Sequence, residues 1–166
     1  SFSGCVAYRG LVEADRLAHL QLALTMQLWM GPGQHFVHYF VRRRELVNFV
    51  AVVERSHWTR ESWTARGDKA QALAAFAGWH PQVREILSAV DGVNEWALFD
   101  RPPLPLWTFG RVTLLGDACH PMLPFMAQGA AQAIEDGATL AACVAATADV
   151  RAALLQYESL RLQRTS

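Results

Sequence analysis

The chain has 166 residues, enough for one domain or parts of two, and 52% of them are hydrophobic, which argues against disorder. The formal net charge is zero, so charge gives no reason to expect nucleic acid or an anionic membrane as a partner. The three cysteines form no CxxC pair, and their odd number predicts no disulfide framework, which favours a reduced, cytoplasmic setting. No apolar run reaches the roughly 18 residues of a membrane span.

The first half of the chain is predicted to be rich in β-strands. Apolar and alternating runs indicate strands at 6–12, 22–30, 34–41, 46–54 and 94–99. The runs 34–41 and 46–54 are separated by four residues, which predicts a hairpin. A short helix or turn is expected at 14–20, helices at 69–79 and 82–90, a loop at 55–68 and a rigid, proline-rich connector at 101–105.

The second half is predicted to follow the order strand, loop, helix, helix. Residues 111–115 are expected to form a short buried strand, 116–128 a loop, and 129–146 and 152–164 two helices. In an α/β sheet this order places a ligand site at the carboxyl edge of the strand. Because the first half is rich in strands and the second half contains two helices, the predicted class is a mixed α+β protein.

Two features of residues 110–136 suit a ligand site. Asp117 comes directly after the predicted strand, where its carboxylate can accept hydrogen bonds from sugar or ribityl hydroxyls. Gly129, Ala130 and Ala131 open the following helix with small residues, so a ligand can approach its free N–H groups. The start of a helix carries about half a positive charge. It would stabilise a planar ligand that becomes anionic, as reduced flavin does.

The stretch Gly110-Arg111-Val112-Thr113-Leu114-Leu115-Gly116-Asp117-Ala118-Cys119-His120-Pro121, followed by Pro124, Gln128-Gly129 and Ala133-Ile134-Glu135-Asp136, resembles the second FAD motif of the class A flavoprotein monooxygenases. It is most similar to the salicylate hydroxylase and 6-hydroxynicotinate 3-monooxygenase group. Shorter matches extend the resemblance over most of the chain: Ala7-Tyr8-Arg9-Gly10, Gly31-Pro32-Gly33-x-His35-x-x-x-Tyr39 and Tyr157-Glu158-x-x-Arg161.

The resemblance implies a role for each matching residue of the motif. Asp117 is expected to hold the ribityl chain of FAD, and Pro124 to lie beside the isoalloxazine. The backbone N–H groups of Gly129, Ala130 and Ala131 are expected to face the pyrimidine carbonyls. Ala131 stands where many relatives have Asn, which leaves only the backbone contact there. Cys119 and His120 are expected to pack or shape the loop, and no metal site is predicted.

On a strand through 34–41, His35, Val37 and Tyr39 share one face and His38 lies on the other. In the resembling pyridine hydroxylases a His and a Tyr at this spacing line the substrate site. His35 and Tyr39 are therefore the candidate catalytic residues, the other interpretation being an edge-strand His and a half-buried Tyr. Arg9 either supports that site from behind or forms a salt bridge at a strand end.

The resemblance implies a substrate-binding sheet domain at 1–107 and the C-terminal portion of a Rossmann-like FAD-binding domain at 108–166. It implies hydroxylation of a small aromatic substrate with FAD, NAD(P)H and O₂. The sequence contains no GxGxxG for the ADP pyrophosphate, and the chain opens in a strand without Met. It is thus expected to be a piece that lacks the N-terminal half of the enzyme, binds FAD weakly or not at all, and is inactive alone.

Two other functions compete with this reading. A non-catalytic binding or scaffold module could use the same sheet. A hydrolase using Cys119 or His120 would need a third, orienting residue, and none stands at a recognisable spacing.

Overall fold

The computed structural model describes residues 1–58 and 66–165, and residues 59–65 of the predicted loop lie outside this part. The fold is mixed α+β and divides into two compact units. The sheet unit comprises Phe2–Leu98, and the helical unit comprises Phe99–Ser166 together with Ser1. No helix in the described residues combines the length and the hydropathy needed to span a bilayer. The predicted domains 1–107 and 108–166, with their assigned roles, stay a prediction.

The sheet unit contains a six-stranded sheet in the order β2-β3-β4-β1-β6-β5. Its strands are β1 (Phe2–Glu13), β2 (Gln27–Gly31), β3 (Gln34–Val41), β4 (Leu46–Glu54), β5 (Arg66–Gly67) and β6 (Val93–Phe99). The predicted hairpin is confirmed, since β3 and β4 pair antiparallel from Gln34 opposite Val53 to Val41 opposite Leu46. The β1–β4, β2–β3 and β5–β6 pairs are also antiparallel.

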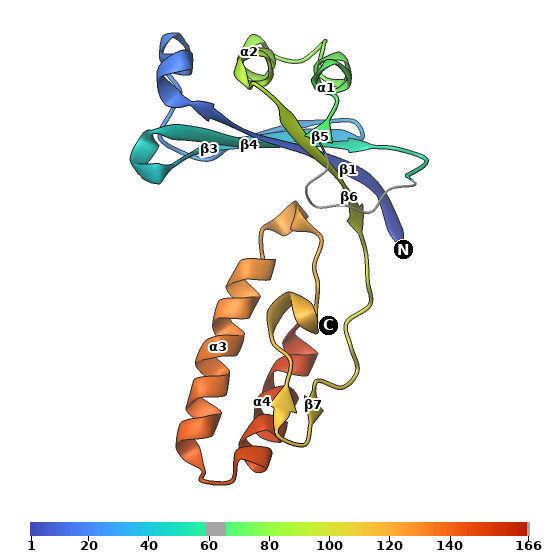
Figure 1. The fold of residues 1–166 in the computed structure, drawn as a ribbon, viewed down its shortest axis with the longest axis vertical. Coiled ribbons are helices and arrows are strands. Elements are labelled where there is room, and N and C mark those ends of the chain that lie inside the picture. Colours follow the sequence, from blue (N-terminus) through green and yellow to red (C-terminus); the bar gives the residue numbers. More distant parts are fainter. Residues whose placement is uncertain (59–65, 166) are drawn as a thin grey trace. The chain divides into compact units, whose positions relative to one another are not determined.

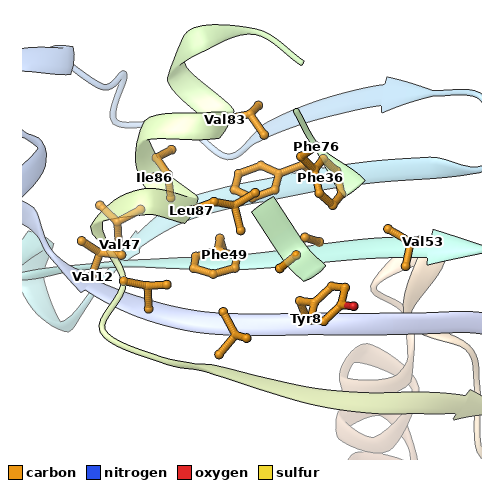
Figure 2. Packing of buried hydrophobic residues seen from close by; sticks show 14 of the residues in the cluster. Tyr8, Val12, Phe36, Val47, Phe49, Val53, Phe76, Val83, Ile86 and Leu87 are labelled. Carbon is orange, nitrogen blue, oxygen red and sulfur yellow. The ribbon is translucent and has the colours of Figure 1, made fainter. Parts of the chain in front are cut away.

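One face of this sheet is covered by α1 (Lys69–Ala75), α2 (Pro81–Ala89) and the 3₁₀ helix η1 (Ala14–Leu20) (Figure 1). Alternation along the strands decides which side chains face these helices. Figure 2 shows Phe36 and Phe49 from the strands beside Leu87 from α2, and Tyr8 and Ile86 belong to the same buried cluster. We call the opposite side of the sheet, turned away from α1 and α2, the far face.

The helical unit is built on α3 (Gly129–Ala146) and α4 (Val150–Thr165), which pack side by side as a hairpin (Figure 1). Before them come the short strands β7 (Thr108–Phe109) and β8 (Val112–Thr113) and the 3₁₀ turns η3 (Gly116–Ala118) and η4 (Pro124–Met126). This unit has its own small core, whose buried members are Trp107, Cys119, Cys143, Ala153 and Tyr157.

Two strand predictions are wrong in part. The predicted buried strand 111–115 is a two-residue strand in which Val112 is 62% exposed, because β7 is its neighbour in the two-stranded sheet and nothing else in the described residues pairs with it. The run 22–30 enters a strand only at Gln27, because the chain bends at Leu24 and Thr25 and leaves residues 22–26 out of the ladder. The two-residue β5 and the turns η3 and η4 lie in segments predicted to be loops.

His38 is a polar residue enclosed in the apolar layer beneath the helices. It is 1% exposed, and neither ring nitrogen has a hydrogen-bond partner in the described residues. Burial lowers the pKa of the His38 imidazole, so the ring is held neutral with an unsatisfied N–H. Leaving such a donor unpaired costs about 1–3 kcal/mol.

His38→Leu is expected to raise the free energy of unfolding by about 1 kcal/mol at pH 7, because it removes that unpaired donor and keeps a similar volume. Because the pKa of His38 is lower in the folded chain, the imidazole takes up a proton at a higher pH in the unfolded chain than in the folded chain. The stability from neutral His38 is therefore present above about pH 6.5 and is lost as the pH falls through the folded pKa. Urea unfolding between pH 8 and 5 should show a shallower acid slope for the variant.

Candidate functional site

The helical unit brings together two of the predicted cofactor-binding positions that lie 12 residues apart in sequence. Oδ1 of Asp117 lies 3.6 Å from the point where a Cβ atom on Gly129 would stand. The Asp117 side chain is exposed and has no hydrogen bond or ion pair to any described residue. We call Asp117 together with Gly129, Ala130 and Ala131 the cradle.

The helix start in the cradle is open to a ligand. No side chain caps the N-terminus of α3, and the N-cap residue Gln128 contributes only a backbone carbonyl, which accepts from Gln132 N at 2.9 Å. Ala130 and Ala131 are exposed and Gly129 is half-buried, so no bulky group covers the first turn. Pro124 begins η4 and is exposed.

Behind the cradle lies a buried carboxylate, Asp136, that fixes the Gly116–Asp117 turn. Asp136 is fully buried, and its Oδ2 accepts a hydrogen bond of 2.9 Å from the Gly116 N–H. Gly116 has a φ of +61°, and a Cβ atom there would lie 3.1 Å from the Ala133 Cβ, so the turn requires glycine both for its dihedral angle and for space. Asp136 thus fixes the Leu115–Gly116 peptide, one residue before Asp117.

Two side chains, those of Arg161 and His120, also form hydrogen bonds with the Asp136 carboxylate. Nε of Arg161 donates to Oδ1 at 2.6 Å, and Nε2 of His120 lies 2.6 Å from Oδ2. Burial alone would raise the pKa of Asp136, but the hydrogen bonds from Arg161, Gly116 N–H and His120 outweigh it and hold the pKa below its usual range. Asp136 is therefore a carboxylate, and Nε2 of His120 is the donor.

Arg161 ties α4 to α3 through further contacts. It donates to Glu135 Oε2 at 2.7 Å and to Gln132 Oε1 at 2.6 Å. Arg164 donates to the same Glu135 carboxylate from the surface, at 2.6 and 2.9 Å. Hydrogen bonds from Arg164 and Arg161 lower the pKa of Glu135 to about 2. We call Asp136, Arg161, His120 and Gln132, all of them buried, the buried network.

The same face of α4 also anchors the segment leading into the cradle. Glu158 Oε2 accepts from the backbone N–H groups of Trp107 at 3.1 Å and Thr108 at 2.7 Å, and Tyr157 Oη donates to the Leu114 carbonyl at 3.2 Å. The motif Tyr157-Glu158-x-x-Arg161 therefore consists of three residues that each hold part of the segment 107–136. Their roles were missed from the sequence, and the Glu135-Asp136 pair within an alanine-rich helix was the available signal.

Cys119, His120 and Asp136 place one potential metal-ligand atom each within 4.8 Å of one another, and all three residues are buried. The charge balance disfavours a cation, because Arg161 already neutralises Asp136. Burial and the nearby Asp136 raise the pKa of the Cys119 thiol to about 11, so it stays protonated. Both residues are fully buried, and Sγ of Cys119 donates to the Gly116 carbonyl at 3.3 Å.

The predicted substrate residues lie in the sheet unit. Phe36 and His38 face the helices, and His35, Val37 and Tyr39 point to the far face, as their alternation predicted. Leu28 lies opposite Val37 and Met30 opposite His35, so β2 adds apolar side chains that are 52% and 80% exposed. Burial lowers the pKa of His35, which keeps its ring neutral at pH 7. His35 and Tyr39 are about 13 Å apart along the strand, so they can line one pocket but cannot bond to each other.

The residues of the cradle fit the part of FAD that the motif implies. An exposed carboxylate acceptor stands beside an uncapped helix start of small residues, which offers both an acceptor for ribityl hydroxyls and N–H donors for ring carbonyls. The sequence has no GxGxxG turn for the ADP end. The fit therefore covers the flavin and ribityl part of the cofactor.

Comparison with known proteins gives a matching result. Residues 24–166 match the family described as FAD binding domain. The chain is 47% identical over 164 residues to the 3-amino-4-hydroxybenzoate 2-monooxygenase PtnB3 of Streptomyces platensis, covering 98% of this chain and 41% of that protein. It is 46% identical to the 6-hydroxynicotinate 3-monooxygenase of Bordetella bronchiseptica, covering 99% of this chain and 44% of that protein.

Solved structures agree. A salicylate hydroxylase in a substrate complex superimposes with a TM-score of 0.83 at 31% identity, over 99% of this chain and 44% of that one. HpxO of Klebsiella pneumoniae, complexed with FAD and uric acid, gives a TM-score of 0.82 at 31% identity, over 99% of this chain and 41% of that one. The chain belongs to the class A FAD-dependent aromatic hydroxylase family and spans less than half the length of these relatives.

Proposed function

We propose that this chain is the substrate-sheet and flavin-ring portion of an enzyme that hydroxylates a phenolic or hydroxypyridine carboxylate. The observation that carries the proposal is the cradle, in which Asp117 stands beside the uncapped start of α3. The buried network supports it, because Asp136 fixes the Gly116 peptide in front of Asp117.

In this proposal each residue of the cradle has one task. Asp117 accepts hydrogen bonds from ribityl hydroxyls, and the N–H groups of Gly129, Ala130 and Ala131 donate to the carbonyl edge of the flavin ring. Pro124 borders the ring near its reacting edge and helps to exclude water. When bound, FAD supplies the redox chemistry with O₂, and NAD(P)H is the reductant.

The proposed substrate class follows from the relatives together with the far face. The relatives named above act on an aminohydroxybenzoate and a hydroxynicotinate, both of which are aromatic acids with a ring hydroxyl. Tyr39 and the neutral His35 are proposed to bind the polar groups of such a ring, and Leu28 to supply apolar wall. Their role is to orient the ring carbon that is attacked.

We further propose that the 166-residue chain alone binds FAD weakly and does not turn over. The absent GxGxxG turn would hold the pyrophosphate, and its loss removes the backbone donors of that site.

The test is a chimera in which this chain replaces the matched segment of the Bordetella bronchiseptica 6-hydroxynicotinate 3-monooxygenase. We expect bound FAD and NAD(P)H oxidation that depends on an aromatic acid and yields a hydroxylated product by mass spectrometry. Asp117→Ala in the chimera should weaken FAD binding by about tenfold or more, since it removes a charged acceptor. The exposed Asp15, changed to Ala, is the matched control and should have no effect.

A folded chimera that binds no flavin, or whose flavin binding ignores Asp117→Ala, would contradict the proposal. It would then favour the second candidate function, a non-catalytic binding module that uses the same sheet.

A further inference from the structure

Arg9 is a cation on the far face of the sheet without an acidic partner in the described residues. Its neighbours in β1 with the same alternation are Ala7 and Leu11, and the β4 residue opposite it is Val50. Its Nε donates to Asn48 Oδ1 at 3.3 Å, and its guanidinium carbon lies 5.9 Å from the centre of the Trp96 ring. The structure records no ion pair between Arg9 and any described residue, and the side chain is exposed.

Asn48 shows a second unmet donor at the same place. Its side chain is on the far face and is 2% exposed, and Nδ2 has no hydrogen-bond partner in the described residues. The amide orientation follows from chemistry, because Arg9 Nε can only donate and so must meet the oxygen. Nδ2 therefore points away from Arg9 Nε, and a buried unpaired donor costs free energy that an acceptor would recover.

Tyr39 lies next to this pair, since it is the residue of β3 directly opposite Asn48. Directly opposed side chains on one face of a sheet have Cβ atoms about 5 Å apart. A predicted substrate residue, a buried amide donor and an exposed guanidinium thus meet at one place. Around them the far face is apolar, with Leu11 51% and Leu28 52% exposed.

We propose that Arg9 and Asn48 form an oxyanion-binding site on the far face, adjoining Tyr39. The terminal N–H groups of Arg9 match the two oxygens of a carboxylate or a phosphate, and Asn48 both orients Arg9 through Oδ1 and donates through Nδ2. A single cation set in an apolar surface is the arrangement that an aromatic acid needs. The assignment of the anion to the substrate's carboxylate rests on the proposed hydroxylase function; the site itself does not.

Nδ2 of Asn48 is buried in this structure, so a neighbouring side chain has to move before an anion can contact it. Arg9 can move at small cost, because its hydrogen bond to Asn48 is 3.3 Å long, beyond the usual range, and its other contact is with the face of the Trp96 ring. The anion then replaces the unpaired state of Nδ2 with a charge-assisted hydrogen bond.

The test uses the ¹⁵N-labelled 166-residue chain and follows the side-chain N–H signals of Asn48 and Trp96. Benzoate is the carboxylate probe, benzamide its neutral match, and ADP the phosphate probe. We expect saturable shifts with benzoate and none with benzamide. Arg9→Gln should weaken the binding at least tenfold. Arg84→Gln, which removes the same charge from the exposed outer side of α2, should leave it unchanged.

Asn48→Asp is the second variant, since it keeps the size of the side chain and places a carboxylate beside Arg9. It should abolish benzoate binding while the remaining amide spectrum stays folded. Equal shifts with benzamide, no saturable shift, or binding that survives Arg9→Gln would overturn the site. Saturation by ADP and not by benzoate, lost in Arg9→Gln, would keep the site and assign it to a nucleotide phosphate. Failure of the chimera to hydroxylate, with Arg9-dependent benzoate binding intact, would overturn the proposed function alone.

Discussion

Asp136→Ala is expected to lower the free energy of unfolding of the helical unit by about 3–5 kcal/mol, the usual cost of removing one partner from a buried ion pair. Asp136 is fully buried and Arg161 is 3% exposed, so the guanidinium would lose its nearest counterion away from water. The Gly116 N–H and His120 Nε2 would lose their acceptor as well. Denaturant unfolding, read through the amide exchange of α3 and α4, measures the loss.

The exposed pair Arg16–Asp91 provides the matched control. Its atoms are 2.9 Å apart, but the Asp91 side chain is 90% exposed, so Asp91→Ala should cost at most about 1 kcal/mol. A double variant in which Asp136 and Arg161 are both Leu should be more stable than the sum of the single losses predicts, because no buried charge is left unpaired. A loss for Asp136→Ala no larger than that for Asp91→Ala would show that the buried network contributes little.

The pH dependence has a defined sign. Because hydrogen bonds hold the pKa of Asp136 below its usual value, the stability it contributes is fully present above about pH 4 and is lost as the pH falls through the folded pKa. The wild-type chain should therefore lose stability in acid more steeply than Asp136→Ala. Glu135, whose pKa is lowered to about 2, acts with the same sign and keeps part of the slope in both.

The sheet could be predicted well from sequence because its period is local. In β1, Tyr8 and Val12 are buried while Arg9, Leu11 and Glu13 are exposed, and β3 and β4 were found with their observed bounds. Burial is less visible, since it depends on which partner lies alongside. The apolar run 112–115 looked buried, yet Val112 is exposed because β7 is the neighbour it has in the described residues. A two-residue strand such as β5 has no period to detect.

The candidate site divides along the same line. Asp117 and Gly129 were predicted because each stands at the boundary of a predicted strand or helix. The contact of Arg161 with Asp136 joins residues 25 apart on two helices, and no local pattern encodes such a pair. Likewise the sequence predicted that His38 lies on the other face of the strand from His35. Its burial, however, depends on helices more than 30 residues away in the chain. The unpaired amide of Asn48 was invisible for the same reason.

The two units have separate cores, so a core substitution in one unit is expected to destabilise that unit and not the other. Trp107 is fully buried in the helical unit, with its ring 5.3 Å from that of His120 and 5.9 Å from that of Tyr157. Trp107→Ala is expected to cost about 3–5 kcal/mol, the range for removing a buried Trp side chain. The core that surrounds it has few other buried residues, so a loss of this size is expected to exceed the free energy of unfolding of the helical unit.

Amide exchange should therefore show that Trp107→Ala removes protection from α3 and α4 while β1, β3 and β4 keep theirs. Phe49→Ala, in the core of the sheet unit, should give the reverse pattern. In the chimera, Trp107→Ala should also abolish flavin binding, because Trp107 packs on His120, His120 binds Asp136, and Asp136 holds the Gly116 peptide. An equal loss of protection in both units would show instead that the chain unfolds as one cooperative body, and that the cradle draws its stability from the sheet as well as from the helices.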